Sequence, residues 1–345
     1  MSFPVASSSF RLLLPLFHSS HRSVPVKRFT AITFVSFFSS NSTKMAANVK
    51  NILITGGTDG IGREAVIYFA SQPNYNVSFT GRSEEKAERL IAKCQEENNE
   101  LAPPKFLKYD FSIDSEVVLF EKEVAEANNF DICVINHGVM HPNDLSTVNN
   151  RNSTMMPNLV SSYIIARKII EERADPERNI HFVFTTSMMI ILYPYRWFLS
   201  LFKIFNPKLE ADWLKMCRRT RTSGWNEYMA SKMGMATLAS SITADDTIQN
   251  VTANCVHPGI VFTNLMSTFS RPRQSRARCL IGLIGTSLTA AGQHLVNAAK
   301  NPLVGRGRYW YRNGPNTLPS DDYSDVTILA FNNVMKKLRA EVETP

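Results

Sequence analysis

Tyr228 and Lys232 lie four residues apart in the stretch WNEYMASKMG, which spans residues 225–234 and contains good helix formers. On a helix, side chains at positions i and i+4 share one face, so this phenol and this ammonium lie within reach of each other. A free phenol titrates near about pH 10, and a neighbouring cation lowers that pKa. The spacing therefore indicates a tyrosine that can serve as a general acid or base, with a surface pair as the alternative.

A strand, a glycine turn and a helix precede this pair in the sequence NILITGGTDGIGREAVIYFA, residues 51–70. Residues 52–54 form a short apolar strand, and the helix that follows the turn is amphipathic. Glycines let the backbone approach a pyrophosphate, and the N-terminus of the helix offers free N–H groups and the positive end of its dipole. The arrangement predicts a dinucleotide site whose turn contains Gly56, Gly57, Gly60 and Gly62.

The spacing Thr55-Gly56-x-x-x-Gly60-x-Gly62 resembles that of the short-chain dehydrogenase/reductase family, and the resemblance covers roughly residues 48–320. It implies an α/β fold, a doubly wound parallel sheet (Rossmann fold), in a single domain over residues 48–345. It also implies that the turn binds the cofactor through Thr55, Gly56, Thr58, Gly60, Ile61 and Gly62.

The second strand, NVSFTGRS, decides between the two nicotinamide cofactors. In dinucleotide folds, an acid at the end of this strand binds the ribose 2′-hydroxyl, whereas a nearby Arg accepts a 2′-phosphate. Gly81 occupies the acid position and Arg82 follows it. We therefore expect NADPH (NADP) to be preferred over NADH, with an exposed turn arginine as the alternative reading of Arg82. Asp59 lies where some NADPH-using relatives carry a basic residue.

The resemblance assigns further residues to the cofactor. Asp110 and Phe111 follow a third strand and are expected against the adenine. Asn136 and Gly138 end a buried strand and match the family's Asn-Asn-Ala-Gly, from which His137 departs. We expect His137 to border the cofactor rather than to act as a base. The later motif HPGIVFT resembles the loop that closes over the nicotinamide, through Pro258, Gly259, Ile260 and Thr263.

The resemblance also completes a catalytic set around Tyr228 and Lys232. Ser187 ends a strand and fits the family's catalytic serine, with Thr186 as a weaker alternative. Asn158 falls where the family has its asparagine, and would position a water that relays protons past Lys232. Tyr228 would exchange the proton with a carbonyl or alcohol oxygen as hydride moves. Lys232 would lower the pKa of Tyr228 and bind the nicotinamide ribose. No metal is needed because the cofactor carries the difficult chemistry.

Forty residues separate Ser187 from Tyr228, far more than is usual in the family. This insertion, about residues 188–225, begins with an aromatic and aliphatic run at the edge of the sheet where ligands bind in open α/β folds. We interpret it as a lid over an apolar pocket, which could also contact a membrane surface. The alternative is an extra helical pair that covers apolar surface. A lid implies a lipophilic carbonyl or alcohol, such as a steroid, retinoid or long-chain ketone.

Two rival functions follow from the same residues. The chain could reduce acyl or quinone-like carbonyls, since the cluster RPRQSRAR at 271–278 would suit an acidic substrate such as an acyl thioester. It could instead be a non-catalytic subunit that senses NADPH. The intact set of Asn158, Ser187, Tyr228 and Lys232 favours an enzyme, because a sensor has no use for a proton donor. Family members often form homo-oligomers, which makes self-association an expectation by analogy.

Composition excludes other classes. The chain has 345 residues and a formal net charge of +8, but residues 1–50 carry six of its basic residues and no acid. The rest has 32 basic against 30 acidic residues, so we expect no nucleic-acid binding. Residues 1–47, rich in Ser and Phe with scattered Arg, predict a mitochondrial or plastid transit peptide. A start at Met45 would instead leave the protein in the cytoplasm. Five scattered cysteines argue against a disulfide framework.

Overall fold

The computed structural model describes residues 49–127, 129–140, 147–148, 151–173, 175–187, 209–218, 224–261, 285–305, 308–311, 314–317 and 324–344. Residues Ala47–Pro345 form one compact unit. Its strands are β1 (Lys50–Ile54), β2 (Tyr75–Gly81), β3 (Lys105–Lys108), β4 (Ile132–Ile135), β5 (Thr147–Val148), β6 (Arg151–Asn152), β7 (Ile180–Thr185), β8 (Val251–His257), β9 (Arg308–Tyr311) and β10 (Gly314–Thr317). Its helices are α1 (Gly60–Ala70), α2 (Glu84–Glu97), α3 (Asp114–Ala127), the π-helix η1 (Met156–Val160), α4 (Ser161–Glu171), α7 (Glu210–Arg218), α8 (Gly224–Thr243), α10 (Leu288–Lys300) and α11 (Asp325–Glu343).

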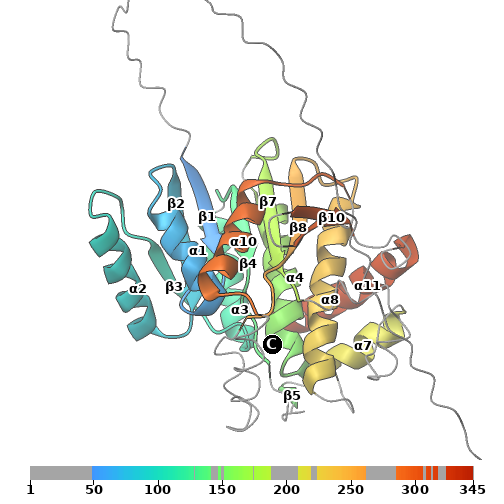
Figure 1. The fold of residues 1–345 in the computed structure, drawn as a ribbon. Helices are drawn as coiled ribbons and strands as arrows, with labels where there is room; N and C mark the ends of the chain where they lie inside the picture. Colours follow the sequence, from blue (N-terminus) through green and yellow to red (C-terminus); the bar gives the residue numbers. More distant parts are fainter. Residues whose placement is uncertain are drawn as a thin grey trace, which may run out of the picture. The chain divides into compact units, whose positions relative to one another are not determined.

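Eight of these strands form one sheet in the order β10-β9-β8-β7-β4-β1-β2-β3 (Figure 1). All neighbours pair in parallel except β9 and β10, which are antiparallel. The chain adds β2 and β3 on one side of β1 and then returns to place β4 on the other side. This reversal makes a topological switch point at the carboxyl ends of β1 and β4, where open α/β sheets bind ligands. The predicted doubly wound parallel sheet is confirmed.

Helices cover both faces of the sheet and define two apolar cores. One core joins α1, α2 and α10 to the sheet, with Phe69 and Phe79 fully buried. The other joins α3, α4, α7, α8 and α11 to the opposite face, and includes Phe182, Phe184 and Trp213. Strands β4 and β7 are buried along their whole length, as expected for a parallel sheet with both faces covered.

Helix α8 lies within the second core and carries the predicted acid–base pair. Every residue from Met229 to Ile242 is buried, so the helix has almost no solvent face. It contacts β7, β8, η1 and α11. A helix enclosed in this way keeps its position without lateral freedom, which suits an element that must hold reacting groups.

The described part of the insertion is α7, which packs against α11 (Figure 1, yellow and red). The indole of Trp213 meets the ring of Phe331 edge-on, with centroids 5.0 Å apart. At the end of the helix, Arg218 pairs with Glu341. Over residues 209–218 the insertion therefore covers apolar surface of α11, as the alternative expected of it, and the lid stays a prediction. The rest of the insertion lies outside the described residues.

Other expectations concern parts of the chain that the structure leaves undescribed. The leader at 1–47 and the arginine cluster at 271–278 both belong there. Among the described helices, none is long and apolar enough to cross a membrane. Peripheral membrane contact and self-association stay predictions.

An ion cluster fastens α11 to the second face of the sheet. Arg339 donates to Glu121 of α3 and to Glu171 of α4, both at 2.7 Å, and to Glu343 one turn along its own helix. The Glu121 side chain is only 5% exposed. Burial raises the pKa of its carboxyl, although the guanidinium opposes that shift. A buried carboxylate that loses its cation is costly, so Arg339 holds this contact in place.

We expect Arg339→Met to lower the free energy of unfolding by about 3 kcal/mol, because it leaves Glu121 buried without its cation. Urea unfolding at neutral pH measures this loss. Adding Glu121→Gln to the same variant should recover most of it. Lys336→Met, a change of an exposed cation on the same helix, is the control. A loss no larger than that of the control would contradict the role given to Arg339.

Candidate active site

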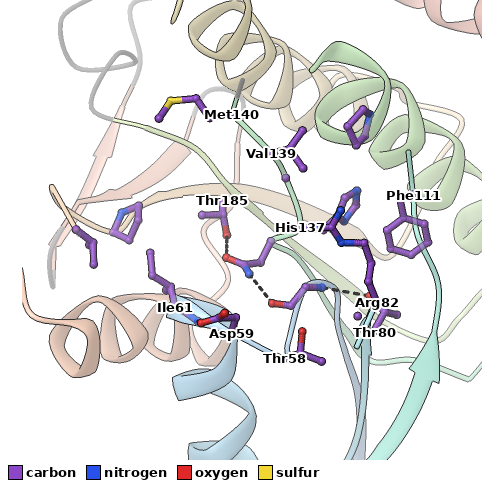
Figure 2. Close-up of a pocket in the computed structure, with 18 of the residues that line it drawn as sticks. Thr58, Asp59, Ile61, Thr80, Arg82, Phe111, His137, Val139, Met140 and Thr185 are labelled. Carbon is purple, nitrogen blue, oxygen red and sulfur yellow. Dashed lines mark hydrogen bonds between the residues drawn. The ribbon is translucent and has the colours of Figure 1, made fainter. Parts of the chain in front are cut away.

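A cavity of about 680 Å³ opens at the carboxyl ends of the central strands (Figure 2). Its walls come from the β1–α1 turn, the ends of β2, β3, β4 and β7, helix α8 and the loop after β8. Most of the residues predicted from the sequence line it: Gly56, Thr58, Gly60, Ile61, Arg82, Asp110, Phe111, Asn136, Gly138, Ser187, Tyr228, Lys232, Pro258 and Gly259. Thr55, Gly62, Asn158 and Ile260 lie directly behind the wall, next in sequence to residues that line it. Thr263 lies outside the described residues.

The glycine turn leaves no room for a side chain at Gly56 or Gly62. Gly56 has a φ of +65°, which favours glycine. A Cβ on Gly62 would lie 2.3 Å from the Gly56 carbonyl oxygen and 2.5 Å from Nδ2 of Asn136. The amide of Asn136 donates to that same carbonyl at 3.2 Å, which ties the end of β4 to the turn. The turn therefore presents bare backbone at the N-terminus of α1, as a pyrophosphate site requires.

The end of β2 has no space for an acidic side chain. A Cβ on Gly81 would lie 2.3 Å from Cγ2 of Thr58 and 2.6 Å from its hydroxyl oxygen. Thr58 therefore occupies the volume in which the carboxylate of an NADH-type site would stand. Next in the chain, Arg82 lines the cavity; its side chain is 65% exposed, and its guanidinium lies 3.7 Å from the carboxylate of Asp110. At the end of β2 the cavity is thus bordered by a glycine and a cation rather than by a carboxylate.

Lys86 is a second cation in the same wall, and the sequence motifs did not identify it. It belongs to the first turn of α2, whose N-cap is Ser83. Its ammonium pairs with Asp59 at 2.5 Å, while the other carboxylate oxygen of Asp59 caps α1 by accepting from the N–H of Gly60. Asp59, which lies where some NADPH-using relatives carry a basic residue, is thus paired with Lys86. Only tertiary packing brings residues 59 and 86 together.

Lys232 is buried at the far end of the cavity and points its ammonium at the sheet. Its Nζ donates to the carbonyl oxygen of Thr185 at 3.0 Å and lies 5.9 Å from the centre of the Tyr228 ring. The hydroxyl of Thr185 donates in turn to Asn136, at the start of the hydrogen bonds drawn in Figure 2. Helix, strand and glycine turn are thereby linked around one ammonium group.

Burial shifts both members of the pair. It lowers the pKa of Lys232 to about 8 and raises the pKa of Tyr228 to about 12. The sequence-based expectation that Lys232 lowers the pKa of Tyr228 is not met in this structure. The reason is that the ammonium is directed at a carbonyl rather than at the phenol oxygen, so loss of water dominates at both groups. Tyr228 is therefore protonated at neutral pH.

Asn158 sits in the π-helix η1 with its side chain fully enclosed. Its amide oxygen accepts from the N–H of Val139 at 2.7 Å, and its amide nitrogen donates to the Val139 carbonyl at 2.9 Å and to Ser231 at 3.0 Å. A π-turn inside a helix often marks a functional site. Here the Asn158 side chain joins the backbone after β4 to the middle of α8.

The two candidate hydroxyls at the end of β7 differ in their surroundings. Thr186 is buried and its hydroxyl donates to the Val256 carbonyl at 2.9 Å. Ser187 is partly exposed and lines the cavity. Ser187 is thus the hydroxyl better placed to reach a ligand, in keeping with the preference for it over Thr186.

The loop after β8 is held by the start of α10. Gly259 has a φ of +100°, and a Cβ there would lie 2.0 Å from the Thr286 hydroxyl oxygen. The N–H of Thr286 donates to the Ile260 carbonyl at 2.8 Å, and Nδ1 of His294 lies 3.1 Å from the Pro258 carbonyl. These contacts fix the described part of the loop beside Tyr228 and Lys232.

Comparison with known proteins agrees with this geometry. Residues 50–196 match the family model described as short chain dehydrogenase. A short chain dehydrogenase from Burkholderia cenocepacia J2315, solved in complex with NADP, superposes with a TM-score of 0.53 at 19% identity, over 75% of this chain and 94% of that one. The chain has the short-chain dehydrogenase fold.

Two further relatives extend the comparison. A short chain dehydrogenase/reductase family protein superposes with a TM-score of 0.52 at 18% identity, over 74% of this chain and 91% of that one. The 3-oxoacyl-(acyl-carrier-protein) reductase FabG of Chlamydia pneumoniae is 23% identical over 224 residues, which are 64% of this chain and 77% of the relative. The family match ends at residue 196, inside the insertion that separates Ser187 from Tyr228.

We expect Lys232 to titrate with a midpoint of about pH 8, because burial favours its neutral form. The Lys232 ammonium is charged below this midpoint and neutral above it. Because the pKa is lowered, the neutral form appears at a lower pH than in an exposed lysine. Nitrogen-15 NMR of lysine-labelled protein measures the titration, and loss of one signal in Lys232→Arg assigns it. The other lysine signals are the internal reference. A Lys232 signal that titrates together with the exposed lysines would contradict the burial argument.

Proposed function

We propose that this short-chain dehydrogenase is an NADP-dependent oxidoreductase that transfers hydride between the nicotinamide and a carbonyl or secondary alcohol. The observation that carries the proposal is the shared cavity. The bare glycine turn, the cation-lined end of β2 and the pair Tyr228 and Lys232 all face one volume at the switch point of the sheet. A redox enzyme needs these three parts together, whereas a sensing subunit would need only the first two.

The nicotinamide, when bound, supplies or accepts the hydride. The chain supplies the proton and the electrostatic setting. Because its pKa is about 12, Tyr228 carries its proton at neutral pH and can donate it to a carbonyl oxygen as negative charge develops there. Ser187 hydrogen-bonds the same oxygen, and preorganised donors of this kind stabilise the transition state. This protonation state suits reduction better than oxidation.

Lys232 and Asn158 support that step. The Lys232 ammonium binds the nicotinamide ribose and places positive charge near the oxygen that gains charge. The side chain of Asn158 is bonded to Val139 and Ser231. Its contribution to the proton relay is therefore made by its main chain, which positions the expected water. Both groups are buried, and electrostatic effects are larger in such an environment than in water.

NADPH is the proposed cofactor because two cations and a missing carboxylate favour a 2′-phosphate. Arg82 and Lys86 both line the cavity, and Thr58 lies where a side chain on Gly81 would stand. Asp110 and Asp59 stay paired with these cations at 3.7 Å and 2.5 Å. Arginine is well suited to bidentate phosphate binding, and Lys86 adds a point charge.

A lipophilic carbonyl is the proposed substrate class. Val139 and Met140, both labelled in Figure 2, are apolar residues that line the cavity. Val261 is a third apolar residue of the lining. A 3-oxoacyl thioester is a second candidate, because the chain is similar to a protein named 3-oxoacyl-(acyl-carrier-protein) reductase. Both substrates present a ketone next to a long apolar chain.

Oxidation of NADPH in the presence of a panel of carbonyls tests the function. We expect turnover with a long-chain ketone or a 3-oxoacyl thioester and much less with a small hydrophilic carbonyl. Tyr228→Phe should reduce turnover by about 10²-fold or more, since general acids contribute on that scale, while leaving NADPH affinity almost unchanged. Tight NADPH binding without turnover on any carbonyl would instead favour a sensing subunit. Substantial activity of Tyr228→Phe would mean that another group is the acid.

Arg82→Ala tests the cofactor preference. A charge-assisted hydrogen bond contributes roughly 1.5–3 kcal/mol, so the variant should raise the Kd for NADPH about ten- to hundredfold. The Kd for NADH should change little. Tryptophan fluorescence during titration measures both. Arg89→Ala is the control, since Arg89 lies on α2 but pairs with Glu85 outside the cavity. Equal losses for the two cofactors would overturn the preference.

A further inference from the structure

His137 lies between the glycine turn and the π-helix, and the mechanism above gives it no task. Its side chain is buried and borders the cavity next to Phe111, with ring centroids 4.5 Å apart (Figure 2). Nδ1 lies 2.7 Å from the hydroxyl oxygen of Thr55, at the end of β1. Nε2 lies 3.0 Å from the hydroxyl oxygen of Ser161 and 3.3 Å from that of Ser162. One imidazole therefore spans from β1 to the start of α4.

Both serines also bond to the π-helix that carries Asn158. The Ser161 hydroxyl donates to the Pro157 carbonyl at 2.8 Å, and the Ser162 hydroxyl donates to the main-chain carbonyl of Asn158 at 2.9 Å. On the β1 side of the imidazole, the Thr55 hydroxyl oxygen also accepts from the main-chain N–H of Asn136 at 2.9 Å. Among the described residues, these bonds place only the His137 imidazole between Thr55 and the serines Ser161 and Ser162.

Counting hydrogens decides the tautomer. Each hydroxyl has one hydrogen, and a neutral imidazole has one N–H and one acceptor nitrogen. If Nδ1 carried the hydrogen, Nε2 would need a serine hydroxyl, and one short bond to a π-helix carbonyl would be lost. If Nε2 carries it, both serines keep those bonds. Thr55 then donates to Nδ1 and gives up only its long 3.3 Å contact with the Val134 carbonyl. The second arrangement satisfies every group.

The ring is neutral at every physiological pH. Burial and, to a lesser extent, the charge of Lys232 lower the pKa of His137 to about 3. The second effect also shows that His137 and the acid–base pair share one electrostatic environment. A neutral ring that donates at one end and accepts at the other acts as a rigid spacer, which a shorter asparagine side chain at this position could not span.

We propose that His137, as its Nε2–H tautomer, is a positioning residue that fixes the Asn158-bearing π-helix to the end of β1 and so sets the rate of proton transfer at Tyr228. The path runs through Ser162 and the Asn158 carbonyl, and then through the Asn158 amide to Val139 beside Lys232. A Cβ on Gly138, between them, would lie 3.0 Å from Oδ1 of Asn158 and 3.4 Å from Nζ of Lys232. The effect on the rate of proton transfer rests on the proposed function, whereas the tautomer and the positioning of Asn158 do not.

His137→Phe keeps a ring in the cavity wall and removes both hydrogen bonds. We expect kcat to fall roughly ten- to hundredfold, the size of effect that small misplacement of catalytic groups produces. The KM for NADPH should stay within about threefold, because the substitution leaves the glycine turn, Arg82 and Lys86 unchanged. His137→Gln, which can donate to Ser161, should recover part of the loss. An increase in KM without a change in kcat would overturn the proposal.

His181→Phe is the matched control. His181 is also buried and hydrogen-bonded at both nitrogens, to Thr252 and to the Ala298 carbonyl, but it lies outside the cavity wall. It should lower stability without changing kcat. A kcat for His137→Phe equal to that of this control would mean that His137 has a structural role only.

Ser162→Ala should lower kcat as His137→Phe does, and the double variant should be no worse than the poorer single one, because both act on one path. Additive losses would contradict that path.

NMR tests the positioning without any turnover. In histidine-labelled protein, His137 should show a protonated Nε2 and an unprotonated Nδ1, and the reverse pattern would overturn the assigned tautomer. The side-chain amide signal of Asn158 should shift in His137→Phe and His137→Gln but not in His181→Phe. An unchanged signal would overturn the proposal. If the wild type reduces no carbonyl, the proposed function fails, and these signals still decide the role of His137.

Discussion

Burying a primary ammonium costs free energy unless acceptors and compensating groups surround it, and this constraint shapes the centre of the fold. Lys232 is 4% exposed, and its Nζ reaches the Thr185 carbonyl. That bond requires β7 to end at Thr185 and α8 to lie enclosed against β7 and β8. The Thr185 hydroxyl then bonds Asn136, whose amide bonds the glycine turn. Cofactor site and acid–base pair are therefore parts of one hydrogen-bonded unit rather than neighbours by chance.

The same low-dielectric interior explains why the polar network is so completely paired. Unsatisfied groups are expensive there, whereas a satisfied network rigidifies its surroundings. The Thr55–His137–Ser161 connection and the Asn158–Val139 pair close this network on the side of the π-helix. A π-turn is a strained arrangement, and these bonds are what hold it. The network keeps the elements around the cavity in register while the cavity itself stays open to a ligand.

The insertion shows how the fold absorbs added sequence. The family match ends at residue 196, within that segment, and the strands β7 and β8 on either side of the insertion pair with each other in parallel. Helix α7 uses Trp213 to cover the apolar surface of α11, and Arg339 ties α11 to α3 and α4. Helix α11 also contacts α8, so α7, α8 and α11 belong to one core on this face of the sheet.

By itself, the sequence determined the features that depend on local geometry. A strand, a turn with Gly56 in a glycine-favouring conformation and a capped helix follow from neighbouring residues, as does the placement of Tyr228 and Lys232 on one helix. Tertiary structure alone decided the rest. The pKa of Tyr228 is raised by burial rather than lowered, because desolvation depends on which distant elements cover a group. The pairing of Asp59 with Lys86, the spanning position of His137 and the packing of α7 likewise join residues far apart in the chain. Periodicity and motif spacing carry no information about such contacts, since they arise only when separate elements pack together.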